Sequence, residues 1–165
     1  MINPKTKEKA TSMSRDRILK LLDAEWEDFL DSHAGLSPEQ LLLPGVTGNW
    51  SVRDILAHVT TWEEEALKHL PVILEGGAPP RYSVKYGGID SFNARMTGEK
   101  SGLPLAAVLR ELSEVHLRLI EFVKRVGEDQ FRNDTRFRRR LRLDTFSHYP
   151  KHARAIRAWR EKNDL

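Results

Sequence analysis

Hydrophobic residues recur at the three- and four-residue spacing of amphipathic helices in four long segments of the chain. No segment shows the strict alternation that is typical of a half-buried strand. The pattern therefore predicts an all-α fold with four principal helices. They cover residues 14–35, 51–70, 104–127 and a last segment that starts near 144 or 147 and ends at 162.

Two helix starts carry recognisable signals. Ser51 and Asp54 have the spacing of a capping box, with Asp in place of the commoner Glu. In the last segment, Pro150 is compatible with a helix only near its first turn, because a proline nitrogen cannot donate to the preceding turn. This restriction favours Ser147 as the cap of the last helix, or a bend at that point.

The second and third helices are separated by a connection of about thirty residues that contains Gly and Pro pairs and a possible short helix after Asp90. A connection of this length can cross the whole bundle, so the two helices can run parallel. We predict a single four-helix bundle with up-down-down-up topology. Its domain covers residues 14–165, and residues 1–13 form a disordered polar N-terminus.

The composition limits the kinds of catalytic and metal-binding sites that the chain can form. The chain has no cysteine, which excludes disulfides, thiolate metal sites and a cysteine nucleophile, and leaves His, Asp and Glu as the strong metal ligands. The N-terminus lacks the apolar core of a signal peptide, and no segment approaches the roughly 20 apolar residues of a membrane span. We expect a cytoplasmic protein that does not associate with membranes.

The net charge of +3 is a mild excess of basic residues. Its one local concentration is the arginine-rich stretch 136–142, for which we expect a solvated basic loop or the start of a helix. A pocket for an anionic group, or a weak phosphate-binding patch, is the alternative. We do not expect nucleic acid to be a partner, and we rank association through these arginines last among the functions considered.

Three histidines point to a common interior. His148 and His152 are one helical turn apart on the apolar side of the last helix, and His58 lies at the edge of the apolar arc of the second. Three neutral imidazoles can hold a divalent metal and leave a coordination position open. The alternative is structural, since buried histidines also hydrogen-bond backbone or carboxylates. His116 faces inward as well, whereas His69 looks peripheral.

The segments "NWSVRDILAHVTTWEEEAL" and "DTFSHYPKHARAIRAWR", with "DSFNARM" between them, resemble the DinB/YfiT-like superfamily of four-helix bundles, and in particular its ClbS/DfsB branch. The resemblance implies an up-down-down-up bundle and frequent homodimers. It also implies a divalent metal (Zn, Ni or Fe) held by one histidine of the second helix and two of the fourth. His58, His148 and His152 match these three positions.

This resemblance also implies an activity. Relatives use the site for transfer or isomerisation with a low-molecular-weight thiol, and the ClbS-like branch opens a reactive ring of a genotoxin. We therefore expect a metal-dependent enzyme, a hydrolase or a thiol transferase, that acts on a small electrophilic or toxic molecule. The alternative is a non-catalytic bundle that binds and sequesters a small apolar ligand or genotoxin.

Four further residues are candidates for the site. Glu65 lies two turns from His58 on the same side of the helix and is our choice for an acid–base role, against a plain surface role. Asn93 matches a recurrent asparagine of similar sequences and is expected to bind substrate, or else to cap a loop. Trp62 and Tyr149 are expected to bind substrate too, although both suit the core.

Overall fold

The computed structural model describes residues 13–165, and the expectation of a disordered segment at 1–13 lies almost wholly outside them. The described residues form helices and no strand. In chain order these are α1 (Arg15–His33), α2 (Pro38–Leu41), α3 (Val52–Leu74), α4 (Tyr82–Lys85), α5 (Ile89–Lys100), α6 (Leu105–Arg125), α7 (Asp129–Arg132), α8 (Arg136–Asp144) and α9 (Tyr149–Lys162). The prediction of an all-α bundle is confirmed.

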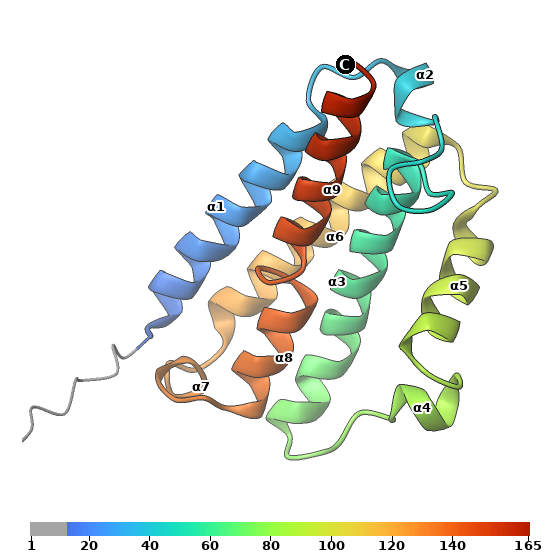
Figure 1. Ribbon diagram of the computed structural model, residues 1–165. Helices are drawn as coiled ribbons and strands as arrows, with labels where there is room; N and C mark the ends of the chain where they lie inside the picture. The colour runs from blue at the N-terminus through green and yellow to red at the C-terminus, as the bar shows by residue number, and fades with distance from the viewer. Residues whose placement is uncertain (1–12) are drawn as a thin grey trace, which may run out of the picture.

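The long helices pack as one bundle (Figure 1). In the view of Figure 1 the chain rises along α1, descends along α3, descends again along α6 and returns upward through α8 and α9. α1 packs against α9, and α3 packs against α6, α8 and α5. The core between them consists of apolar side chains that the helical spacing had marked, among them Ile18, Leu56, Val108, Leu119 and Ile156.

The start of α3 has the predicted cap. The Ser51 hydroxyl accepts from the Asp54 backbone N–H, and the Asp54 carboxylate accepts from the Ser51 backbone N–H at 2.9 Å. The crossover is fastened close by, because Arg53 Nη2 donates to the carbonyls of Lys100 and Leu103 at 2.5 and 2.6 Å. These bonds hold the end of α5 and the approach to α6 against the first turn of α3.

The fourth helix of the bundle is built in two pieces, α8 and α9, which meet near Ser147, where we expected a helix cap or a bend. The arginine-rich stretch expected as a loop or helix start is the regular helix α8, capped by Thr135. α9 begins at Tyr149 with His148 at the N-cap, one residue later than the expected Ser147, and Pro150 lies in its first turn. The chain bends between the pieces, where proline can be accommodated.

A buried polar cluster joins four helices in the core. The Glu63 side chain on α3 has no exposed surface; its Oε1 lies 2.8 Å from His116 Nδ1 on α6 and accepts a short hydrogen bond from the Tyr149 hydroxyl on α9. Trp26 on α1 stacks on the His116 ring, with centroids 3.6 Å apart. The pairing of Glu63 Oε1 with both side chains restricts how the four helices can pack, whereas Glu63 Oε2 is buried without a partner among the described residues.

Among the helices of residues 13–165, none combines the length and the apolar character that crossing a bilayer requires.

We predict that Tyr149→Phe lowers the free energy of unfolding by about 1–3 kcal/mol, because it leaves the buried Glu63 carboxylate without its hydroxyl donor. Denaturant unfolding measures this loss. The control is Ser113→Ala, which removes an exposed hydroxyl of α6 and should change stability by no more than about 0.5 kcal/mol. Equal small effects of the two variants would contradict the role given to the cluster.

Candidate metal centre

The three predicted histidines converge. His58 lies in the N-terminal third of α3, His148 is the N-cap residue of α9 and His152 follows one turn later. His148 Nε2 is 3.1 Å from His58 Nε2 and 2.9 Å from His152 Nε2, and one ring nitrogen of each lies within 4.8 Å of the others. Residues 90 positions apart in the chain therefore present their nitrogens to one point.

The surroundings keep all three imidazoles neutral. Burial, with a smaller contribution from the neighbouring imidazoles, lowers the pKa of His58 to about 3 and that of His148 to about 2. Burial, followed by the charge of Lys151, lowers the pKa of His152 to about 4. Neutral imidazole nitrogens are the form that binds metals, so no proton has to be displaced near pH 7.

Two of the three separations between the ring nitrogens fit a shared divalent ion. With metal–nitrogen bonds of about 2.0–2.1 Å and bond angles of about 90–110°, two bound nitrogens lie roughly 2.9–3.4 Å apart. The two short Nε2 separations, 3.1 and 2.9 Å, fall in or beside this range. One feature departs from the usual arrangement, in which the second ring nitrogen donates a hydrogen bond: His148 Nδ1 is buried without a partner among the described residues.

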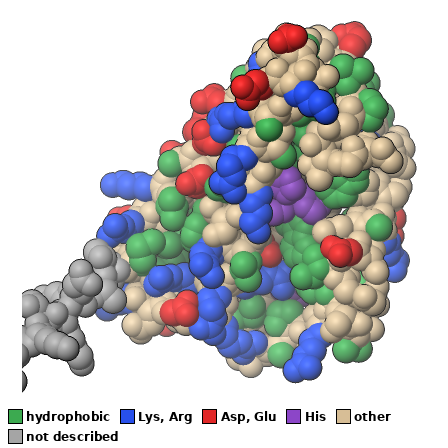
Figure 2. Space-filling view, in the orientation of Figure 1, with side chains coloured by type: hydrophobic (Ala, Val, Ile, Leu, Met, Phe, Trp, Pro, Cys, Tyr) green, Lys and Arg blue, Asp and Glu red, His purple; other side chains and the backbone are tan. Residues whose placement is uncertain are grey.

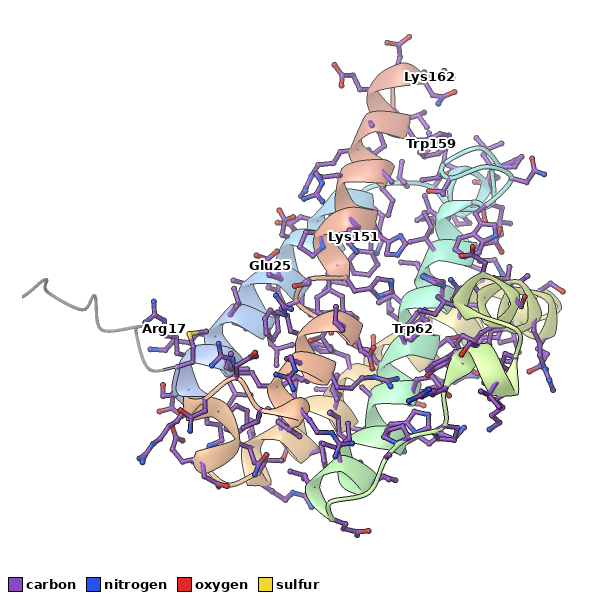
Figure 3. The ribbon with its side chains drawn as sticks, turned by 60° about the horizontal axis from the view of Figure 1, so that its bottom comes forward. Arg17, Glu25, Trp62, Lys151, Trp159 and Lys162 are labelled. Atoms are coloured by element: carbon purple, nitrogen blue, oxygen red, sulfur yellow. The ribbon has the colours of Figure 1, made fainter. Side chains whose placement is uncertain are left out.

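The histidines form part of the wall of a cavity of about 460 Å³. Figure 2 shows histidine side chains at the surface in a hollow that hydrophobic and basic side chains border. The apolar wall consists of Trp62, Ile89 and Leu143, and the polar wall of Tyr82, Asn93, Arg140, Asp144 and Lys151. In Figure 3, Lys151 on α9 and Trp62 on α3 lie on opposite sides of the space between these helices. A small organic molecule fits a cavity of this size.

Two of the candidate substrate-binding residues line this cavity together. The Trp62 indole N–H donates to Asn93 Oδ1 at 3.1 Å. Because an indole N–H can only donate, it fixes the orientation of the Asn93 amide and leaves the Asn93 Nδ2 donors free of this contact. Trp62 also lies edge-on to His58, with ring centroids 6.4 Å apart, so the indole borders the histidine cluster.

Glu65 and Tyr149 lie behind the cavity wall. Glu65 is almost fully buried; its Oε2 lies 3.0 Å from His69 Nε2 and accepts from the Tyr82 hydroxyl, which itself lines the cavity. Tyr149 has no exposed surface and belongs to the core cluster around Glu63. The expectation that His69 is peripheral was wrong, because its ring is buried against Glu65.

The polar end of the cavity contains Arg140, from the stretch 136–142 for which a pocket for an anionic group was the alternative, together with Tyr82 and Asp144, which the sequence did not point to. Arg140 Nε donates to Asp144 Oδ2 at 2.5 Å, and Arg140 Nη2 donates to the Tyr82 hydroxyl at 3.0 Å. Burial raises the pKa of Asp144 to about 7 although Arg140 acts in the opposite direction. The sequence signal that could have indicated this group is the spacing, because Arg140, Asp144 and His148 follow one another at intervals of four residues.

The sequence matches the DinB superfamily over residues 21–154. The chain belongs to the DinB superfamily. No curated protein matches it in sequence. The resemblance drawn from the histidine-bearing segments is thereby confirmed at the level of the superfamily.

Solved structures share the DinB fold along most of the chain. The colibactin self-resistance protein ClbS, solved in complex with dsDNA, is 17% identical with a TM-score of 0.73 over 89% of this chain and 95% of its own. An uncharacterised protein from Escherichia coli UTI89 is 17% identical, with a TM-score of 0.77 over 93% and 96% of the two chains. DfsB, described as a sibling lethal factor precursor, is 13% identical, with a TM-score of 0.75 over 91% and 96%.

The ClbS structure corrects one expectation. From the mild net charge we did not expect nucleic acid as a partner, yet a protein of this fold was crystallised with dsDNA. Net charge was a poor guide because a bundle can concentrate its basic side chains on one face while acidic side chains elsewhere offset them.

We predict that Tyr82→Phe destabilises the fold by about 1–3 kcal/mol, because its hydroxyl joins Glu65 to Arg140 at the cavity wall. Chemical denaturation measures the change. Tyr86→Phe is the matched control, since the Tyr86 hydroxyl makes no hydrogen bond within residues 13–165, and it should leave stability within about 0.5 kcal/mol of wild type. If the Tyr82 variant behaves like the Tyr86 variant, the network has no stabilising role.

Proposed function

We propose that this DinB protein is a metal-dependent enzyme that acts on a small electrophilic or toxic molecule. The observation that carries the proposal is the convergence of three neutral imidazoles on the wall of a cavity large enough for such a molecule. A purely structural histidine cluster has no need of an adjoining cavity. His58, His148 and His152 would hold the ion, and Zn, Ni or Fe suits three nitrogen ligands.

When bound, the ion supplies Lewis acidity, which activates a nucleophile and polarises an electrophile. The remaining wall residues act on the substrate. Trp62, Ile89 and Leu143 offer an apolar surface to the substrate, and Asn93 is oriented to donate to a substrate oxygen. We keep Glu65 as the acid–base candidate, acting through the Tyr82 hydroxyl that separates it from the cavity.

The metal part of the proposal has a direct test. We expect full-length protein to take up about one equivalent of Zn²⁺, and the unfolding midpoint to rise with the concentration of free Zn²⁺. His152→Ala should lose both effects while keeping its helical circular dichroism. His33→Ala, which alters a histidine of α1 outside the cluster, is the control and should bind as wild type does. Zn²⁺ uptake by the His152 variant equal to that of wild type would refute the ligand assignment.

The two reaction types differ in the nucleophile. We expect the metal-loaded protein to speed the opening of styrene oxide, a strained electrophile, either by water to the diol or by added cysteine to the thioether. Mass spectrometry of the products with and without cysteine separates a hydrolase from a thiol transferase. Stoichiometric binding of the epoxide without product, unchanged in His58→Ala, would favour the non-catalytic sequestering bundle instead.

A second candidate function, association with DNA, has its own support. Arg142, Lys151 and Arg154 are exposed on α8 and α9, and none of them forms an ion pair with another described residue. The structural neighbour ClbS was crystallised with dsDNA. Because Lys151 lines the cavity, a duplex bound at this side chain would lie near the cavity.

We predict that duplex binding weakens as the salt concentration increases. The triple variant Arg142→Gln/Lys151→Gln/Arg154→Gln should make the negative slope of log K against log salt shallower by about 3, or about 1 per phosphate contact. Fluorescence anisotropy of a labelled duplex measures this slope. Arg118→Gln, at an exposed arginine of α6, is the control. An unchanged slope in the triple variant would exclude these side chains as the DNA-binding face.

The homodimer and the cytoplasmic location expected from the sequence stay predictions. Sedimentation analysis of the full chain tests the first of them.

A further inference from the structure

The polar end of the cavity contains hydrogen-bonding atoms that the protein itself does not use. Arg140 binds Asp144 through Nε and Tyr82 through Nη2, whereas its Nη1 has no partner among the described residues and is not fully buried. Asp144 Oδ2 accepts from Arg140, whereas Asp144 Oδ1 has no partner there and is not sealed from solvent either. Since both residues line the cavity, a donor group and an acceptor that the protein leaves unpaired both belong to its wall.

The guanidinium is held in a fixed orientation. Its Nε and Nη2 bonds use one side of the planar group, and the Tyr82 hydroxyl that accepts from Nη2 is anchored in turn by Glu65. The Arg140 side chain is only 16% exposed and that of Asp144 only 4%, so neither can swing away freely. A planar guanidinium presents two parallel donors at its unused end, which matches the two oxygens of a carboxylate.

We propose that Arg140 and Asp144 form a subsite for the zwitterionic α-amino acid group of a small ligand. The ligand carboxylate accepts from the free end of Arg140, and the ligand ammonium donates to Asp144 Oδ1. A simple anion would leave Asp144 Oδ1 without a partner, and a simple cation would leave Arg140 Nη1 without one. A zwitterion pairs both groups and brings no net charge into a partly dry site.

The subsite adds a ligand-binding group to the proposed function. It rests on the proposed function only for the reaction at the other end of the ligand. An α-amino acid group held by Arg140 and Asp144 leaves the rest of the ligand to extend along Trp62, Ile89 and Leu143 toward the histidines. A low-molecular-weight thiol that contains an amino acid group has this chemistry, with its sulfur directed to the histidine cluster. Binding of the amino acid group itself needs neither thiol nor metal.

The test therefore uses ligands without sulfur. L-norleucine carries both charged groups on an apolar chain, hexanoate lacks the ammonium and pentylamine lacks the carboxylate. Titration calorimetry on the full-length protein, repeated with excess chelator, should show norleucine binding at least about tenfold more tightly than either analogue in both conditions. Norleucine binding no tighter than hexanoate or pentylamine would overturn the subsite.

Substitutions test whether the preference for norleucine depends on Arg140 and Asp144. Arg140→Gln alone leaves Asp144 as an unpaired buried charge, so the double variant Arg140→Gln/Asp144→Asn is preferred, because it removes both charges together. We expect the double variant to lose the preference for norleucine, and Arg139→Gln, an exposed neighbour on α8 that pairs with Asp134, to keep it. Unchanged preference in the double variant would contradict the assignment, whatever the outcome of the Zn²⁺ titration.

Discussion

The hydrogen bond from the Tyr149 hydroxyl to the buried Glu63 carboxylate fixes α9 against α3 directly beside the histidine cluster. Glu63 lies five residues after His58, and Tyr149 follows His148 in the chain. The same carboxylate contacts His116, on which Trp26 stacks, so α1 and α6 take part in this restraint. The separation of the imidazoles therefore depends on a pairing in the core, and displacement of α9 would move two of the three nitrogens at once.

The cavity beside this restraint has two chemically different ends. At one end, three imidazoles are kept neutral by burial and so present lone pairs. At the other end, the ion pair of Arg140 and Asp144 keeps charged groups in a partly buried place, where Tyr82 and Glu65 support them. The apolar surface of Trp62, Ile89 and Leu143 connects the two. This division suits a ligand with a polar head and a reactive tail.

Helical periodicity predicted the all-α bundle because each long helix buries one face, and the spacing of His148 and His152 placed both on one side of a helix. The capping box at Ser51 also followed from local sequence. The break between α8 and α9 was located only approximately, since Pro150 restricts the helix start without fixing it. The contacts of Tyr82 with Glu65 and Arg140 join residues 17 and 58 positions apart, and no local pattern carries information about such contacts.

The most direct test of the central claim is an X-ray absorption spectrum of the full-length protein loaded with one equivalent of Zn²⁺. The account predicts multiple scattering from three imidazoles, with zinc–nitrogen distances of about 2.0–2.1 Å, and its loss in His148→Ala. A spectrum dominated by oxygen ligands, or one unchanged by that substitution, would contradict the claim that the three histidines form a metal centre.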